Sequence, residues 1–264
     1  SFDPGFRADM GFVGQVDFEK SVIGGSYRWY PKDHFFNQIQ INGDWDITHQ
    51  ISVDRLMEKE IEAYVSANGK MQSFMQLGGG IRDRYWNGVT YDESFYTFYG
   101  QFTPYKSWKL SFFYRGGDQI DFRNNDIGSI TTFEPGLSGA INDNISLNIS
   151  YVDEALDRDG GTVYHARLVD TRLSWQFNLR QRLRLAVQYG NTDFDLTLRP
   201  GYIPGNPTSA SSNDLGTQLV YSYKINPRTV FYAGYSDNYI GSDSIDSFQT
   251  NRSLFLKLGY AWQP

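Results

Sequence analysis

Residues 35–47 read FFNQIQINGDWDI, and apolar and polar side chains largely alternate along this stretch. Because side chains of a β-strand point in turn to opposite faces of the sheet, a period of two predicts a strand with one apolar and one polar face. The apolar face carries Phe35, Ile39, Ile41, Trp45 and Ile47, and the polar face carries Gln38, Gln40, Asn42, Asp44 and Asp46.

The same alternation recurs at residues 108–115, 144–151, 170–177, 182–189 and 253–262. We expect the strands that contain these runs to be about ten residues or longer, whereas strands of soluble sheets are mostly about five or six residues long. About ten tilted residues are needed for a strand to cross the hydrocarbon core of a membrane. The predicted fold class is therefore all-β, an antiparallel up-and-down transmembrane β-barrel. A soluble β-sandwich or propeller is the alternative, and strand length argues against it.

The connections between the predicted strands alternate in length, as in bacterial barrels with short periplasmic turns and longer external loops. With a first strand at residues 10–18 the series reaches about fourteen strands, an even number, as a barrel with both ends in the periplasm requires. We expect one transmembrane barrel domain over residues 1–264. The predicted external links are 48–50, 85–92, 117–127, 156–162, 199–213 and 239–251, and the predicted turns are 31–34, 68–70, 104–106, 142–143, 178–181 and 226–228.

The composition suits a membrane protein that crosses the bilayer with strands. Aromatic residues make up 17% of the chain, Gly occurs 26 times and Cys is absent. The mean hydropathy is −0.50, and no run approaches the roughly 20 apolar residues of a membrane-spanning helix. Without Cys the chain can form neither disulfides nor thiolate metal sites, which suits export through an oxidising periplasm. The sequence therefore indicates the outer membrane of a Gram-negative bacterium.

Aromatic residues are expected in two belts, because Trp and Tyr collect where a membrane meets water. The belt near the predicted turns comprises Trp29, Tyr30, Phe35, Tyr105, Trp108, Trp175, Phe177 and Trp262, and the belt near the predicted loops comprises Tyr85, Trp86, Tyr91, Phe95, Tyr151, Tyr164, Tyr189, Tyr235 and Tyr239.

The net charge of −6 and a pI near 5.1 argue against nucleic acid as a partner, because no basic face is available to displace counterions from phosphates. We expect outer-membrane lipid, lipopolysaccharide and the barrel-assembly machinery as partners. The terminal strand, which alternates and ends at Trp262, resembles the C-terminal signal that this machinery reads.

Two parts of the chain resemble a family of uncharacterised outer-membrane proteins. They are FDPGFRADMGFVGQVDF at 2–18, through Phe2, Pro4, Gly11, Phe12, Val13 and Asp17, and the C-terminal segments YKINPRTVFYAGY at 223–235 and NRSLFLKLGY at 251–260. Members of that family join a periplasmic domain, like a family-nine carbohydrate-binding module, to a large C-terminal barrel. The resemblance implies the C-terminal part of a larger barrel, whereas the strand count allows a closed barrel of about fourteen strands. It implies no substrate.

Catalytic chemistry has few candidates. The histidines are His34, His49 and His165, and the chain lacks the G-x-S-x-G elbow of serine hydrolases. A hydrolase at the external rim would need His165 beside Asp153 or Asp170. We expect His165 to be an ordinary rim residue and the protein not to be an enzyme.

Acidic loops are candidates for calcium binding. They contain Asp157, Asp159 and Gly160 in one loop and Asp237, Asp243 and Asp246 in another. Neither matches the spacing of an EF-hand, so we expect solvated loop charges and neither metal nor cofactor.

The polar face of the strands is expected to line the interior, because a barrel of this width is too wide for side chains to fill. This predicts a channel for small hydrophilic solutes. The alternative is a structural sheath or anchor that holds a partner protein in its lumen. The predicted pore-lining residues are Gln38, Gln40, Asn42, Asp44, Asp46, Lys109, Arg115, Asn148, Asp170, Arg172, Arg182, Arg184, Lys224 and Lys257.

Overall fold

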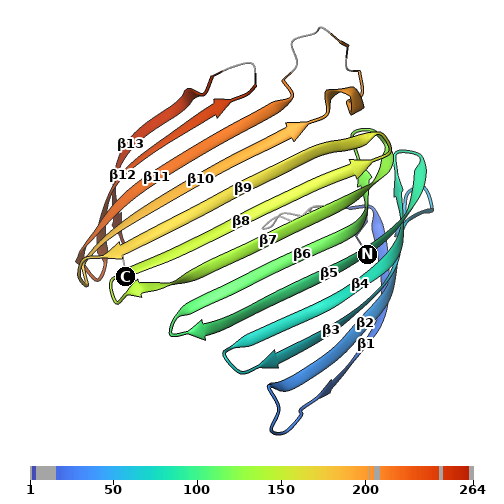
Figure 1. Cartoon of the computed structure of the whole chain (residues 1–264), viewed down its shortest axis with the longest axis horizontal. Helices are drawn as coiled ribbons and strands as arrows, with labels where there is room; N and C mark the ends of the chain where they lie inside the picture. The colour runs from blue at the N-terminus through green and yellow to red at the C-terminus, as the bar shows by residue number, and fades with distance from the viewer. Residues whose placement is uncertain (1, 4–15, 202, 205–208, 244–245, 262–264) are drawn as a thin grey trace. The chain divides into compact units, whose positions relative to one another are not determined.

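The computed structural model describes residues 2–3, 16–201, 203–204, 209–243 and 246–261 (Figure 1). In this part of the chain there are thirteen β-strands and one three-residue 3-10 helix. They are β1 (Phe18–Trp29), β2 (Phe36–Gln50), β3 (Arg55–Gly69), β4 (Ser73–Trp86), β5 (Val89–Tyr105), β6 (Trp108–Asp121), β7 (Asp126–Asn142), β8 (Ile145–Arg158), β9 (Gly161–Gln176), β10 (Gln181–Phe194), η1 (Leu196–Leu198), β11 (Ser211–Asn226), β12 (Thr229–Gly241) and β13 (Phe248–Tyr260).

The strands follow one another in the sheet in the order of the chain, from β1 to β13. The predicted fold class, an all-β antiparallel sheet with up-and-down connections, is confirmed. Strand lengths run from 12 residues in β1 to 17 in β5, longer than most strands of soluble proteins. No helix among the described residues is long and apolar enough to span a membrane.

The structure corrects the prediction in the number of strands and in the bounds of the loops. The predicted strand at 10–18 lies largely outside the described residues, so the expected fourteen strands are thirteen within them. The predicted link 48–50 lies within β2, and residues 51–54 connect β2 to β3 instead. Several other predicted loops are too long, because the strands continue into them. Residues 117–127, for example, contribute to both β6 and β7, and only 122–125 connect them. Polar side chains occupy both sheet faces at these ends, so the alternation that marks a strand fades there.

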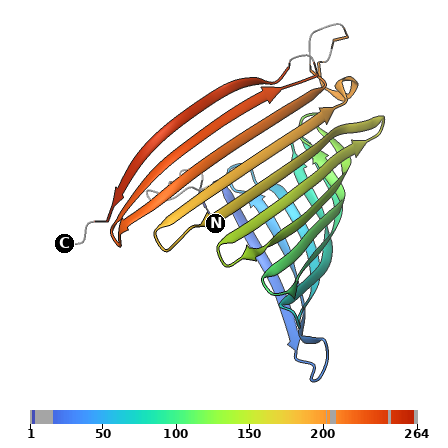
Figure 2. The same cartoon turned by 60° about the vertical axis from the view of Figure 1, so that its left-hand side comes forward.

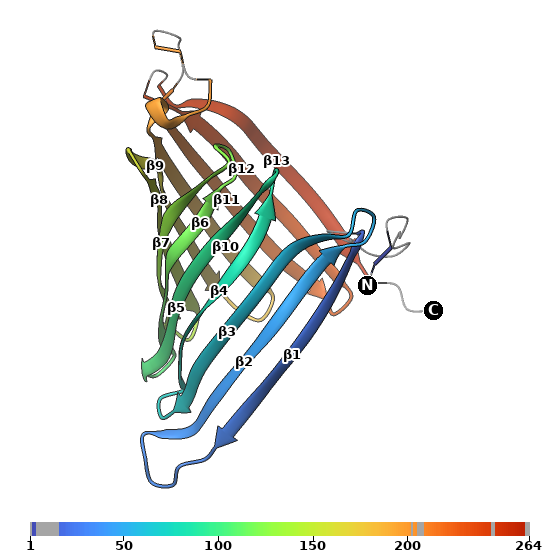
Figure 3. The same ribbon diagram turned by 90° about the vertical axis from the view of Figure 1, so that its right-hand side faces the viewer.

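The described chain divides into two compact units. Unit 1 comprises residues 1–100 and 114–131, and unit 2 comprises residues 101–113 and 132–264. In unit 1 the strands β1 to β4 run side by side (Figure 3). In unit 2 the strands β10 to β13, orange to red in Figure 2, do the same. The expected single domain over residues 1–264 stays a prediction.

The strand register places apolar side chains together on one face of each unit. In unit 1, Ile23, Trp45, Ile61 and Ile81 form one row across β1 to β4, and their exposed fractions are 71%, 37%, 52% and 62%. In unit 2 the matching row is Leu185, Leu219, Tyr235 and Leu254. We call these surfaces the apolar faces of the two units.

Burial is inverted relative to a water-soluble fold. Leu256 is 76% exposed and Phe112 is 37% exposed, so neither lies in a closed core. Fewer apolar than polar residues are buried among those that the structure describes, which is the reverse of an ordinary globular interior. The soluble sandwich is therefore not supported. The buried apolar residues are Tyr91, Ile120, Ile130, Leu156 and Val163, and the buried polar ones are Asp46, Thr48, Ser73, Glu93, Asp121, Thr132 and Asp237.

Aromatic side chains are exposed at both ends of the strands. Near the predicted turns Tyr105 is 64% exposed and Trp175 43%, and near the predicted loops Trp86 is 43% exposed. Two members of the predicted loop belt depart from this. Tyr91 is buried and its hydroxyl donates to the Asn125 carbonyl oxygen at 2.6 Å. The Phe95 ring lies 5.4 Å from the guanidinium carbon of Arg82, on the polar face. Trp262 lies outside the described residues.

Two glycines within strands have different roles. Gly117 has a φ of +126°, a conformation that side chains other than hydrogen rarely adopt, and it interrupts the regular backbone of β6. Gly78 lies within the continuous strand β4. A Cβ atom at this position would stand 2.1 Å from Cδ1 of Tyr64, so Gly78 makes room for the Tyr64 ring across the strand pair.

Replacing Gly78 with Ala is expected to lower the free energy of unfolding by about 1–3 kcal/mol, the usual cost of overpacking. Gly25→Ala is the control, because a Cβ atom at Gly25 would have no neighbour within 4 Å. Urea unfolding of both variants measures the difference. Equal stability of the two variants would contradict the packing role of Gly78.

Candidate functional site

The polar face of unit 1 carries a dense set of carboxylates. Strand register aligns Asp46 of β2 with Glu60 of β3 and Arg82 of β4, and the next row aligns Asp44 with Glu62. These side chains share a face because they sit at alternate positions of paired strands. We call this surface the acidic face; its carboxylates are Asp44, Asp46, Glu58, Glu60, Glu62 and Glu93.

Cations offset part of this negative charge. Lys20 Nζ lies 2.9 Å from Asp46 Oδ2. Arg82 contacts Glu93 at 2.9 Å and Glu60 at 3.5 Å, and Arg84 contacts Glu93 at 2.8 Å. The side chain of Glu93 is fully buried, and the Ile120 amide also donates to Glu93 Oε1 at 3.2 Å. A buried carboxylate with two guanidinium partners and a backbone donor is well satisfied.

The polar face of unit 2 carries mainly cations. Register places Arg182 of β10 in one row with Ser222 of β11, Tyr232 of β12 and Lys257 of β13. Arg184 and Arg172 stand on the same face in the next rows towards the 195–210 connection. We call this surface the basic face; its cations are Arg172, Arg182, Arg184, Lys224 and Lys257.

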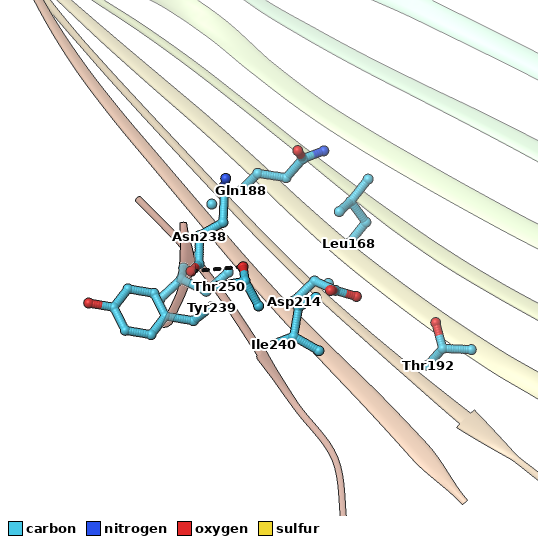
Figure 4. A pocket seen from close by; sticks show the side chains of 11 residues that line it. Leu168, Gln188, Thr192, Asp214, Asn238, Tyr239, Ile240 and Thr250 are labelled. Atoms are coloured by element: carbon cyan, nitrogen blue, oxygen red, sulfur yellow. Dashed lines mark hydrogen bonds between the residues drawn. The ribbon is translucent and has the colours of Figure 1, made fainter. Parts of the chain in front are cut away.

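Two adjoining hollows open on the polar face of unit 2. The first, of about 510 Å³, is lined by Asp170, Arg172, Arg184, Ala186, Gln188, Gly216, Thr217, Gln218, Ser236 and Asn238. The second, of about 590 Å³, shares Gln188, Gly216 and Asn238 with the first. Figure 4 shows the second hollow, with Gln188, Asn238 and Asp214 on neighbouring strands. The Thr250 hydroxyl donates a hydrogen bond to the backbone carbonyl oxygen of Asn238. Both are lined by amide, hydroxyl and carboxylate groups with a few apolar side chains.

The predicted pore-lining residues fall on shared polar faces wherever the register is known. Gln38, Gln40, Asn42, Asp44 and Asp46 align along one face of β2. In unit 2, Asn148 pairs with Arg172 and lies on the same face as the other predicted residues there, Asp170, Arg182, Arg184, Lys224 and Lys257.

Lys109 and Arg115 belong to β6. Both are half-buried, and Arg115 donates to the Gln119 side-chain oxygen at 2.9 Å. That any of these residues lines a pore stays a prediction.

Several members of the acidic face were not predicted. Glu58, Glu60 and Glu62 follow the alternation of EKEIEAYV at residues 58–65, so the signal was present in the sequence. Arg82, Arg84 and Glu93 give a weaker signal, because Glu93 has no charged neighbour at strand spacing. Only the pairing of β4 with β5 brings it to the two arginines.

His165 pairs with Asp153, as one of the two predicted arrangements requires. Its Nε2 lies 3.0 Å from Asp153 Oδ1, and Arg167 Nη2 lies 2.9 Å from its Nδ1. A guanidinium can only donate, so Nδ1 is the acceptor and Nε2 carries the proton. Both ring nitrogens are occupied by Asp153 and Arg167, which leaves no position for activating a nucleophile.

The other predicted arrangement of His165, with Asp170, is wrong. His165 and Asp170 lie five residues apart in β9, and their partners on β10 are Asp193 and Gln188. Because successive side chains of a strand point to opposite faces, residues an odd number apart face opposite sides of the sheet. His49, predicted in an external link, lies within β2.

Acidic residues of the connections hold loop backbone in place. Hydrogen bonds from Ser209 and the Ala210 amide lower the pKa of the Asp243 carboxyl below its usual value. Hydrogen bonds from Ser52 and Gln50 lower the pKa of Asp17 in the same way. No group of three or more potential metal ligands occurs among the described residues.

No protein-family model matches the chain, and no curated protein matches it by sequence. Solved structures that resemble it include outer-membrane proteins. The outer membrane channel DcaP of Acinetobacter baumannii has a TM-score of 0.49 at 10% identity and covers 96% of this chain and 99% of its own. The NanC porin gives 0.35 at 10% identity, covering 91% and 99%, and OmpT, an outer membrane protein of Vibrio cholerae, gives 0.39 at 8% identity, covering 93% and 97%. At these values no functional residue is transferred from them.

Replacing Glu93 with Gln is expected to lower the free energy of unfolding by about 3 kcal/mol, because two guanidinium groups lose their shared buried partner. Arg172→Gln is the control. Its guanidinium pairs with Asp170, but its side chain is 64% exposed, and removing such a pair costs about 1 kcal/mol or less. Unfolding in urea, monitored by tryptophan fluorescence, measures both. Equal costs would show that Glu93 is not the centre of the network.

Proposed function

We propose that this protein is an outer-membrane β-barrel channel that passes small hydrophilic solutes by diffusion. One observation carries the proposal. Long strands expose their apolar side chains and shelter their polar ones, as the contrast between exposed Leu254 and buried Asp46 illustrates. A surface of this kind is stable only where the outer solvent is lipid and the inner solvent is water.

Strand length and hydrogen bonding support the location in a membrane. Strands of 12 to 17 residues exceed the 9–11 tilted residues that cross a bilayer. Every backbone polar group inside lipid must bond within the protein, and strands can achieve this only through a continuous ladder with neighbours on both sides. In the sheet of the thirteen described strands, β2 to β12 each have such neighbours on both sides.

A water-filled interior is supported by the charges of the polar faces. Four cations of the basic face are exposed, and none of them forms a salt bridge with another described residue: Arg182, Arg184, Lys224 and Lys257. Unpaired cations are stable only in contact with water or mobile counterions. A polypeptide plug would need carboxylates against each of them.

Other roles are supported less well. We propose no catalytic role, because His165 has both nitrogens engaged and faces away from the polar side. The sheath or anchor for a partner protein is the second candidate, and it agrees with the resemblance to barrels that carry a carbohydrate-binding-like module. That resemblance, the lipopolysaccharide contacts and the assembly machinery stay predictions.

Planar-bilayer recording of the purified protein tests the proposal. Stepwise single-channel currents in potassium chloride are expected, and their conductance should scale with salt concentration, because bulk ions carry the current. A folded, membrane-inserted protein without current would overturn the channel. Co-purification of a stoichiometric protein whose removal restores current would favour the sheath.

Neighbouring positions of β13 test which face meets lipid. Leu254→Arg, on the apolar face, is expected to lower the stability of the bilayer-inserted protein by about 2–4 kcal/mol. Ser253→Arg, one residue away on the polar face, should change it far less. Unfolding from lipid vesicles by urea measures both variants. A larger cost for Ser253→Arg would reverse the assigned faces.

A further inference from the structure

The hollow of about 510 Å³ on the polar face of unit 2 is large enough for a small molecule. Its volume lies within the usual range of about 300–1,000 Å³ for small-molecule sites. The floor is made by small residues, Ala186, Gly216 and Ser236, on three neighbouring strands. A Cβ atom at Gly216 would stand 3.2 Å from Asn238 Oδ1, so glycine leaves this amide accessible.

The charge at one end of the hollow favours an oxyanion. Arg172 is held by Asp170 through contacts of 2.9 and 3.1 Å, while its side chain stays 64% exposed. Arg184 lines the same hollow and has no hydrogen-bond or ion-pair partner among the described residues. A guanidinium with free N–H groups binds carboxylate or phosphate through two parallel hydrogen bonds. Lys257, one row away, adds to the positive potential of the basic face.

Amide groups line the rest of the hollow. The side chains of Gln188, Gln218 and Asn238 make no hydrogen bond within the described chain and line the hollow together. Each amide offers both donors and acceptors, which suits hydroxyl groups that need one of each. At the far side, Asp214 lines the adjoining hollow (Figure 4), and its negative charge would turn an anionic group towards Arg184.

From these features we propose that the hollow binds a small polyhydroxy carboxylate, a sugar acid in chemical terms, with its carboxylate on Arg184 and Arg172 and its hydroxyl groups on the amides. The proposal rests on the proposed channel, which would bring solutes to this face. Binding to the purified protein does not require conduction, so the two can fail separately.

Isothermal titration of the detergent-solubilised protein with D-glucuronate, D-glucose and inorganic phosphate tests the site. Glucuronate is expected to bind more tightly than either, because only it offers both the carboxylate and the hydroxyl groups. Arg184→Gln should weaken glucuronate binding about tenfold or more, as expected when a charged hydrogen-bond pair is lost. The control is Arg182→Gln, whose guanidinium Nε bonds Ser174 Oγ at 2.7 Å outside the hollow. It should change binding about twofold or less for the same loss of charge.

Each result separates the alternatives. Equal weakening in both variants would show a diffuse positive field and overturn the site. Glucose binding as tight as glucuronate would overturn the role of the arginines, and phosphate binding more tightly would overturn the role of the amides. No binding of any probe to protein with intact β-sheet circular dichroism would also overturn it. Binding without bilayer current would leave the site standing and remove the channel.

Discussion

The constraint that the rest of the structure depends on is that a β-strand offers its two faces to different solvents. A period-two alternation can satisfy water on one side and hydrocarbon on the other while the backbone bonds only to neighbouring strands. In this chain strand pairing gathers apolar side chains into rows on one face and charged side chains into rows on the other. Examples are the apolar row Ile23, Trp45, Ile61 and Ile81 and the charged row Asp46, Glu60 and Arg82. The proposed function depends on the polar face, which contacts water.

The two polar faces differ in how their charges are compensated. In unit 1 three of the carboxylates, Asp46, Glu60 and Glu93, form salt bridges with Lys20, Arg82 and Arg84, and Glu93 is buried. In unit 2 Arg184, Lys224 and Lys257 stay exposed without ion-pair partners in the described chain. A compensated network stiffens a wall, whereas exposed cations remain available to solutes. The chemistry of the proposed passage is therefore concentrated on unit 2.

Small residues shape both units in related ways. Gly78 makes room for the ring of Tyr64, and Gly216 leaves the amide of Asn238 clear. Because glycine has no side chain, the neighbouring strands can place larger polar groups beside these positions. The same device therefore serves packing in unit 1 and the hollow in unit 2.

The alternation of residues such as Ile39, Gln40 and Ile41 was enough to predict the fold class, the two faces of the sheet and most of the connections between the described strands, although the predicted link 48–50 lies within β2. These are local properties, because the period of the hydrophobic pattern and the choice of turn residues depend only on consecutive residues. Only the tertiary structure decided which charges meet. Glu93 reaches Arg82 and Arg84 across the β4–β5 hairpin, and Arg184 and Asn238 line one hollow, because the register of paired strands decides which side chains lie side by side. No sequence period encodes that register.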